Sequence, residues 1–175
     1  MNLSDLQPFL KLAEEALHPF LATLFQEEAS ITFRAPQASG QDKVSVDEAV
    51  VAASPAGRFA VCLDHAGVAL LASKALKKSS APSEATDDFL PEMVDQGYRA
   101  LRPLFASAGL NLPEEDLAIL PQGSALAQTG LPARLVTVPF SLQVGAHGVD
   151  GFVLLAEPMT SSGVEALARR LGVEV

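Results

Sequence analysis

The sequence has few of the features that mark a disulfide-bonded or nucleic-acid-binding protein. Of its 175 residues only Cys62 is a cysteine, which excludes an internal disulfide. Cys62 lies in the apolar run RFAVCL, where a buried, unreactive thiol is favoured over a nucleophile. Lysine and arginine number 12 against 21 aspartates and glutamates. This net charge of −9 argues against nucleic acid as a partner, because phosphate binding needs clustered basic side chains.

Long apolar segments are also missing. No apolar run approaches the roughly 20 residues that a helix needs to cross a bilayer. The N-terminal stretch has acidic residues near its start and lacks the basic segment and continuous apolar core of a signal peptide. A chain of this length can bury the core of one domain. We therefore expect a single cytoplasmic domain over residues 1–175, with no membrane as partner.

Motifs for metals, nucleotides and nucleophilic catalysis are absent as well. The three histidines His18, His65 and His147 are far apart in the sequence, and no HExxH or CxxC spacing is present. The phosphate-binding loops GxxxxGKS/T and GxGxxG and the serine motif GxSxG do not occur. We therefore expect no metal and no cofactor, and residue chemistry alone indicates no enzyme class.

The pattern of apolar residues, in contrast, is informative. Helical spacing predicts helices over 3–26, 68–78, 86–108 and 161–173, with Ser4 as the first N-cap and a kink or a break at Pro19. Alternating and β-branched residues predict strands over 29–36, 44–54, 58–64, around LAIL at 117–120, over 134–144 and over 152–158. The stretches QASGQDK (37–43) and GAHGVDG (145–151) are expected to form a loop and a turn.

The order of these elements indicates the fold class. Strands arrive as hairpins and helices follow them, whereas parallel sheets require strictly alternating strands and helices. We expect an α+β domain in which long helices pack on one face of an antiparallel sheet. From Gly57 and again from Gly151, a glycine-bearing turn joins two apolar strands and the second strand leads into a short helix. This similarity indicates a weak internal duplication.

The helix over 86–108 has the most distinctive polar pattern. Its apolar side chains occupy one arc, and Asp88, Glu92, Asp95 and Arg99 follow one another on the opposite side at spacings of four, three and four. One helix face cannot converge these carboxylates on a metal ion, and an exposed row gives no reason for their pKa values to differ. The residues alone therefore favour a solvated face on which Asp95 pairs with Arg99.

The element order and a few proline, glycine and phenylalanine positions carry a family resemblance. The first helix has Gln7-Pro8-Phe9 near its start, a hairpin turns at 55–58, and LAILPQGSAL and VTVPFSLQVGAHGVDGFVLLAE follow the helix over 86–108. In this order the chain resembles the CheX-type chemotaxis phosphatases of the CheC/CheX/FliY family, whose opening helix carries Asn-Pro-Phe. The likeness covers most of the chain, and it implies a CheC/CheX-like fold and a homodimer.

The resemblance also implies a partner. Members of the family dephosphorylate the response regulator CheY from the helix that corresponds to 86–108. It implies that this chain docks a CheY-like response-regulator receiver domain through Asp88, Glu92, Asp95 and Arg99. Contact through that helix would make the protein a component of chemotaxis-like or two-component signalling.

The family's catalytic pair, a Glu with an Asn three residues later, is not retained here. Asparagine occurs only at positions 2 and 111, and neither has a glutamate three residues before it. Glu92 with Asp95 keeps the spacing but replaces the amide with a carboxylate, whereas Glu92 with Gln96 keeps both chemistries at a spacing of four. Glu92, Asp95 and Gln96 are thus the candidate catalytic residues of an altered aspartyl-phosphate phosphatase.

Two other functions fit the same sequence. A non-enzymatic assembly component, flagellar-switch-like or secretion-chaperone-like, would also use an acidic surface and a long N-terminal helix. A small-molecule binder would require a pocket between helix and sheet.

Overall fold

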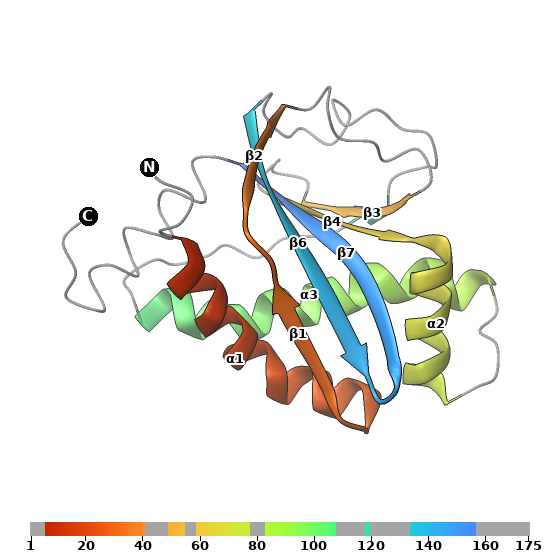
Figure 1. Cartoon of the computed structure of the whole chain (residues 1–175). Coiled ribbons are helices and arrows are strands. Elements are labelled where there is room, and N and C mark those ends of the chain that lie inside the picture. The colour runs from red at the N-terminus through yellow and green to blue at the C-terminus, as the bar shows by residue number, and fades with distance from the viewer. Residues whose placement is uncertain are drawn as a thin grey trace.

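The computed structural model describes residues 6–40, 49–54, 59–77, 83–107, 118–119 and 134–156. Figure 1 shows the three helices and the strands of these segments. The helices are α1 (Leu6–Phe25), α2 (His65–Leu76) and α3 (Ser83–Ser107). The strands are β1 (Ala29–Phe33), β2 (Gln37–Gly40), β3 (Ala49–Ala53), β4 (Phe59–Asp64), β5 (Ala118–Ile119), β6 (Arg134–Val144) and β7 (His147–Ala156).

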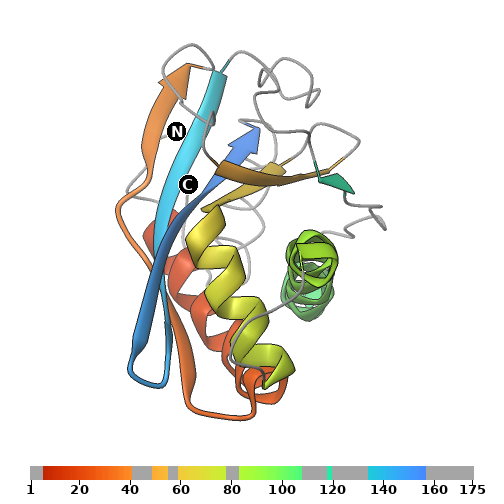
Figure 2. The ribbon, with the colours of Figure 1, turned by 90° about the vertical axis from the view of Figure 1, so that its right-hand side faces the viewer.

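The strands form one antiparallel sheet in the order β1-β6-β7-β4-β3-β5, with β2 also paired to β6. The long β6–β7 hairpin lies at its centre and pairs in continuous register from Leu135↔Ala156 to Val144↔His147. The helices lie on the same side of this sheet (Figures 1 and 2). The predicted α+β fold, with helices on one face of an antiparallel sheet, is confirmed.

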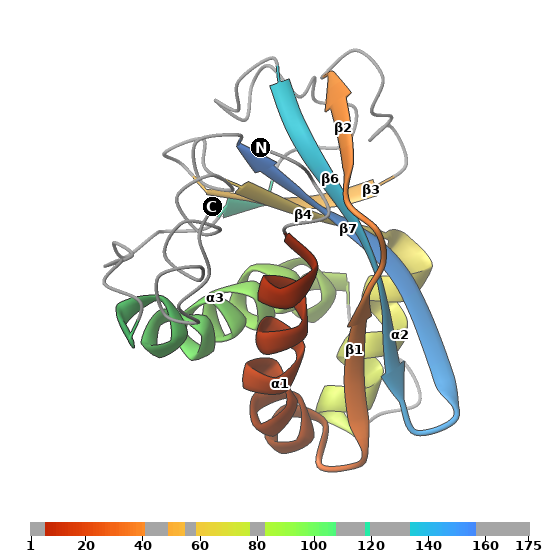
Figure 3. The same ribbon diagram turned by 60° about the vertical axis from the view of Figure 1, so that its left-hand side comes forward.

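The main core fills the space between the helices and the sheet. All three helices and the facing side chains of the strands contribute to it, among them Leu17, Leu21, Phe25, Val68, Leu71, Leu90, Met93, Val50, Leu63, Phe140 and Leu142. Helices α1 and α3 cross (Figure 3), and Gly97 marks their close approach. A Cβ atom at Gly97 would lie 3.4 Å from the Phe20 ring and 3.6 Å from Leu17. The crossing fixes the position of α3.

The opposite face of the sheet carries a second buried cluster. It comprises Val51, Ala53, Ala60, Cys62, Leu135 and Leu154. Side chains alternate between the two faces along a strand, so Val50 and Ala52 join the main core while their neighbours join the second cluster. Burial on both faces explains why the AVVAA and FAVCL segments are continuously apolar instead of alternating.

The edge of the sheet differs from the sequence-based expectation. The strand predicted over 29–36 ends at Phe33. A new strand, β2, begins at Gln37 and pairs, like β1, with β6. The prediction of a loop over 37–43 is therefore wrong for residues 37–40. Between the pairs Phe33↔Phe140 and Gln37↔Thr137, three residues oppose two. This is a β-bulge, and Pro36 within it has no N–H to donate. The polar QASG segment forms a strand because an edge position demands little burial.

The β6–β7 hairpin is tighter than predicted. Residues 145–151 were expected to turn, but β7 begins at His147 and only Gly145 and Ala146 form the turn. Gly145 has the left-handed φ of 58° and donates its N–H to the Glu28 carbonyl at 2.9 Å. The glycines at 148 and 151 therefore lie within a strand, and the pattern of glycines alone could not distinguish this from a loop.

The helix boundaries follow from local capping. Helix α1 continues through Pro19 as one element, so the alternative of two helices is wrong, and Ser4 lies outside the described residues. Helix α2 begins three residues before the predicted Val68, because the Asp64 side chain caps it and accepts from the Gly67 N–H. It ends before Lys77, which has a left-handed φ of 56°. The helix predicted over 161–173, which is the last part of the second copy in the predicted duplication, lies outside the described residues.

No helix in the described part of the chain is both long enough and apolar enough to cross a membrane.

Cys62 provides a test of the second buried cluster. Its side chain is 0% exposed, and burial raises the pKa of the thiol from 9.0 to about 12. The unfolded chain therefore loses this proton above pH 9 while the folded chain keeps it, so stability is full below pH 9 and falls as the pH rises toward 12. We expect the free energy of unfolding to be about 1.4 kcal/mol lower at pH 10 than at pH 8 because of this group.

The measurement is urea unfolding at both pH values for the native chain and for Cys62→Ala. The variant should lose this part of the pH dependence, whatever its stability at pH 8. An unchanged pH dependence in the variant would contradict the buried, protonated thiol.

Candidate functional site

The predicted site lies on α3, whose position is set by its buried face. Leu90 is 0% exposed and Met93 is buried in the main core, and Tyr98 stacks on Phe59 of β4 with ring centroids 5.4 Å apart. These contacts hold one side of α3 against α1 and the sheet. A helix places residues three and four apart on one face, so the polar positions between them face outward. Of these, Asp88 and Glu92 are exposed.

The outward side chains form one hydrogen-bonded pair and one ion pair. The Gln96 Nε2 donates to Glu92 Oε1 at 2.8 Å, and the Arg99 guanidinium lies 3.1 Å from Asp95 Oδ2. Arg99 is 70% exposed and Asp95 is 23% exposed. Both are i,i+4 pairs that join an exposed side chain to a half-buried one, and pairs at this spacing contribute only a few tenths of a kcal/mol. We call the row of Asp88, Glu92, Asp95, Gln96 and Arg99 the α3 acidic face.

This geometry bears on the catalytic candidates. The structure brings Glu92 and Gln96 into contact, while Asp95 pairs with Arg99. An amide keeps a second N–H and a carbonyl oxygen for other partners, so Gln96 can still donate to an anion and accept from water. Among the described residues, no group of three or more His, Cys, Asp or Glu side chains could hold a metal ion.

A second polar cluster lies on the sheet face opposite the helices. The Arg34 guanidinium contacts Asp150 at 2.8 Å and Ser141 Oγ at 2.5 Å, and Ser141 Oγ donates to Asp150 at 2.6 Å. Ser141 and Asp150 are directly opposite each other in the β6–β7 register. The three side chains satisfy one another and connect the bulge to the central hairpin. We therefore assign this cluster a structural role.

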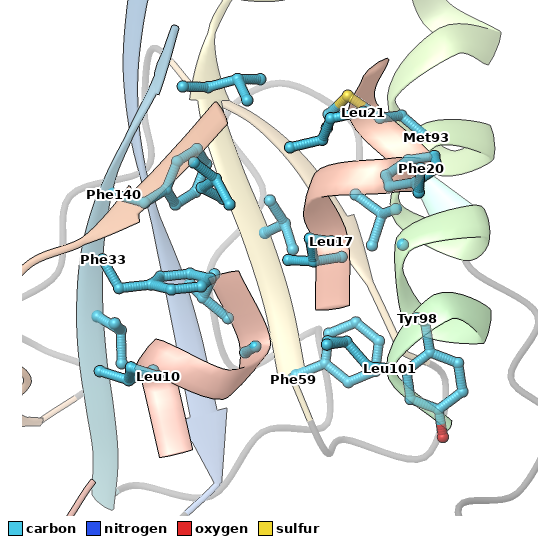
Figure 4. A pocket seen from close by; sticks show the side chains of 18 of the residues that line it. Leu10, Leu17, Phe20, Leu21, Phe33, Phe59, Met93, Tyr98, Leu101 and Phe140 are labelled. Carbon is cyan, nitrogen blue, oxygen red and sulfur yellow. The ribbon is translucent and has the colours of Figure 1, made fainter. Parts of the chain in front are cut away.

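A cavity between α1, α3 and the sheet is a candidate site that the sequence did not reveal (Figure 4). Its volume is about 180 Å³. Leu17 and Phe20 line it from α1, Met93 and Gly97 from α3, and Phe140 from β6. No sequence pattern points to it, because Gly97 on the buried face of α3 is explained by the close approach of Phe20 and Leu17 of α1.

Comparison with known proteins finds structural neighbours only. No protein-family model matches the chain, and no curated protein matches it in sequence. FliY from Thermotoga maritima superposes with a TM-score of 0.76 and 12% identity, covering 97% of this chain and 98% of its own. The FliG–FliM complex from H. pylori gives 0.66 and 10%, with coverage of 94% and 99%. The CheX–CheY–BeF3–Mg complex from Borrelia burgdorferi gives 0.50 and 12%, with coverage of 88% and 98%.

The chain has the fold shared by FliY, FliM and CheX.

The CheX-like fold inferred from element order is thus confirmed over nearly the whole chain. At identities of 10–12%, these superpositions establish the fold alone. The chemistry has to be argued from this chain's own residues. The catalytic roles of Glu92, Asp95 and Gln96 stay predictions. So do the partner contacts of Asp88, Glu92, Asp95 and Arg99.

Proposed function

We propose that this protein is a chemotaxis-related signalling protein that docks a CheY-like response-regulator receiver domain through the α3 acidic face. The observation that carries the proposal is the combination of an exposed, mixed-charge helix face with a CheX-like fold. The Borrelia burgdorferi neighbour is a complex of CheX with CheY, which supports a receiver domain as the partner. In this proposal the protein acts in the cytoplasm and forms a homodimer.

The charges of the α3 acidic face suit a partner with a basic patch. Asp88 and Glu92 are exposed, and Arg99 follows at the far end of the row, so charge changes sign along the helix. A row of both signs favours one orientation of the partner and disfavours others, which gives specificity and a faster association rate. Arg99 is 70% exposed and can exchange its pair with Asp95 for contacts with the partner, because a helical pair at this spacing is weak.

We further propose that any phosphatase activity uses Glu92 and Gln96. The reaction is attack of water on the phosphorus of the receiver's aspartyl phosphate, which releases phosphate and restores the aspartate. Gln96 can accept a hydrogen bond from the water and donate one to a phosphoryl oxygen, and Glu92 fixes its amide at 2.8 Å. Asp95 is the weaker candidate, because a carboxylate facing the acyl phosphate would repel it.

The decay of a phosphorylated receiver domain tests this proposal. The receiver should be one encoded beside this gene, and its decay is followed with and without the protein. We expect faster decay with the protein and its loss in Glu92→Ala, while Glu15→Ala, an exposed glutamate on α1, keeps the native rate. Equal decay with and without the protein would exclude the phosphatase activity.

Docking is tested separately from catalysis. Titration of the beryllofluoride-activated receiver into the native chain should give saturable binding, which Glu92→Lys weakens by about tenfold. Glu15→Lys is the control of equal charge change. If neither variant alters the affinity, the partner does not bind at the α3 acidic face. Analytical ultracentrifugation of the free protein measures its mass in solution, which should be that of two chains if it forms a homodimer.

A second candidate is a non-enzymatic component of a flagellar-switch-like assembly. It is favoured by the TM-scores, which are 0.76 for FliY and 0.66 for the FliG–FliM complex but 0.50 for the CheX–CheY complex. A stable complex with a basic assembly partner, together with no effect on receiver phosphorylation, would support this function over the first.

A further inference from the structure

The cavity between α1, α3 and the sheet has a wall of unusual composition (Figure 4). Its described lining is apolar except for the hydroxyl of Tyr98. In Figure 4 this hydroxyl points away from the other labelled side chains. Six aromatic rings contribute to the lining: those of Phe9, Phe20, Phe33, Phe59, Tyr98 and Phe140. No charged side chain is among the described lining residues.

This space is too large to be a packing defect and too apolar to hold water stably. The cavity is partly open to the surface and measures about 180 Å³, whereas the voids of protein interiors seldom exceed the size of a water molecule. A buried water needs two to four polar partners, which the described lining does not supply. Left empty, the cavity deprives its lining side chains of dispersion contacts. An apolar molecule of matching size would restore those contacts.

Volume and chemistry together define the ligand. An engineered apolar cavity of about 150 Å³ in another protein stays dry and binds benzene, and the present cavity is slightly larger. The aromatic side chains offer ring faces and edges, which favour a guest that is itself aromatic. Without a cation in the described lining, nothing would balance a buried carboxylate or phosphate. We propose that this cavity is a binding site for a neutral aromatic molecule of about the size of toluene.

Helix α3 separates this site from the α3 acidic face. Met93, Val94 and Gly97 line the cavity, while Glu92 and Gln96 point outward from the same turns. The ligand site is therefore distinct in residues from the proposed docking site. Its test does not depend on a receiver domain, and failure of one proposal leaves the other intact.

The experiment is calorimetric titration of the purified native chain with toluene, with thermal unfolding as a second readout. We expect saturable binding of one molecule per chain and a rise in Tm of about 3 °C at ten times the Kd. Benzoate, of similar shape but charged, should bind at least about tenfold more weakly. No saturable binding of toluene up to its solubility would overturn the proposal.

Cavity-filling variants locate the binding. Ala13 is buried and lines the cavity, so Ala13→Leu places three more carbon atoms inside it and should abolish toluene binding. Ala100→Leu on α3 is the matched control, since Ala100 is half-buried and is not among the described lining residues. It should bind toluene with native affinity. Equal binding by both variants would overturn the assignment of this cavity.

A second variant covers the case in which Ala13→Leu does not fold. Val94→Phe fills the cavity from the α3 side, where the native side chain is half-buried. If Val94→Phe has the native circular dichroism spectrum and does not bind toluene, the result supports the assignment of the cavity. If Val94→Phe has the native circular dichroism spectrum and binds toluene with native affinity, the result contradicts the assignment.

Discussion

Replacing Gly151 with alanine is expected to lower the free energy of unfolding by about 3 kcal/mol. Gly151 lies in β7 between Leu63 of β4 and Phe140 of β6. A Cβ atom there would lie 2.5 Å from Leu63 Cδ2, 2.7 Å from Phe140 Cζ and 2.7 Å from the Cys62 carbonyl oxygen. Two of these atoms belong to core side chains and the third to the backbone of a central strand. None can move without disturbing the main core or the sheet ladder.

Gly148→Ala is the matched control within the same strand. The nearest atom to its new Cβ would be the Gln143 Oε1, at 3.1 Å, which ends an exposed and flexible side chain. We expect a change within about 0.5 kcal/mol, as for most surface substitutions. Urea unfolding monitored by circular dichroism measures both variants. Equal stability of the two would show that the Leu63↔Gly151↔Phe140 register is incorrect.

Replacing Leu90 with alanine is expected to cost roughly 2–5 kcal/mol. Leu90 is 0% exposed and belongs to the main core, where α3 meets the other helices and the sheet. The substitution loses the transfer free energy of the buried carbons and leaves a void that the surrounding elements fill only in part. A loss of this size is a large fraction of the stability of an ordinary domain.

The same substitution at Leu76 provides the comparison. Leu76 is 43% exposed at the end of α2, so Leu76→Ala should change the free energy of unfolding by less than about 1 kcal/mol. Both variants are measured by the same urea titration. Should Leu90→Ala prove no more costly than Leu76→Ala, α3 would not pack as described.

Much of the fold was predictable because apolar periodicity is strong where an element is buried. The helices over 3–26 and 86–108 and the strand over 134–144 agree with α1, α3 and β6 to within a few residues. Prediction was wrong where local composition and tertiary context conflict. The QASG segment is polar and was expected to be a loop, yet it pairs with β6 as a strand. Gly151 is typical of a turn, yet it lies within β7, where Phe140 and Leu63 occupy the space beside it.

The candidate site was predictable only in part. Helical spacing alone predicted the Asp95–Arg99 pair, and the structure contains it at 3.1 Å. The contact between Gln96 and Glu92 depends on rotamers, which spacing does not specify. The cavity could not be predicted at all, since its volume depends on how far α1 and α3 lie from the sheet, and that distance is set by side chains from several elements together.

The bulge on the outer strand has a consequence for solubility. A free sheet edge invites pairing with another chain and hence aggregation. Here α1 supplies a carboxylate to that edge, as Glu14 Oε1 accepts the outward Phe33 N–H at 2.8 Å. The bulge with Pro36 then interrupts the row of donors before β2 continues it. The protein thereby limits fibre-like stacking along β1 and β2, whose outer side is not paired with any other strand of the described residues.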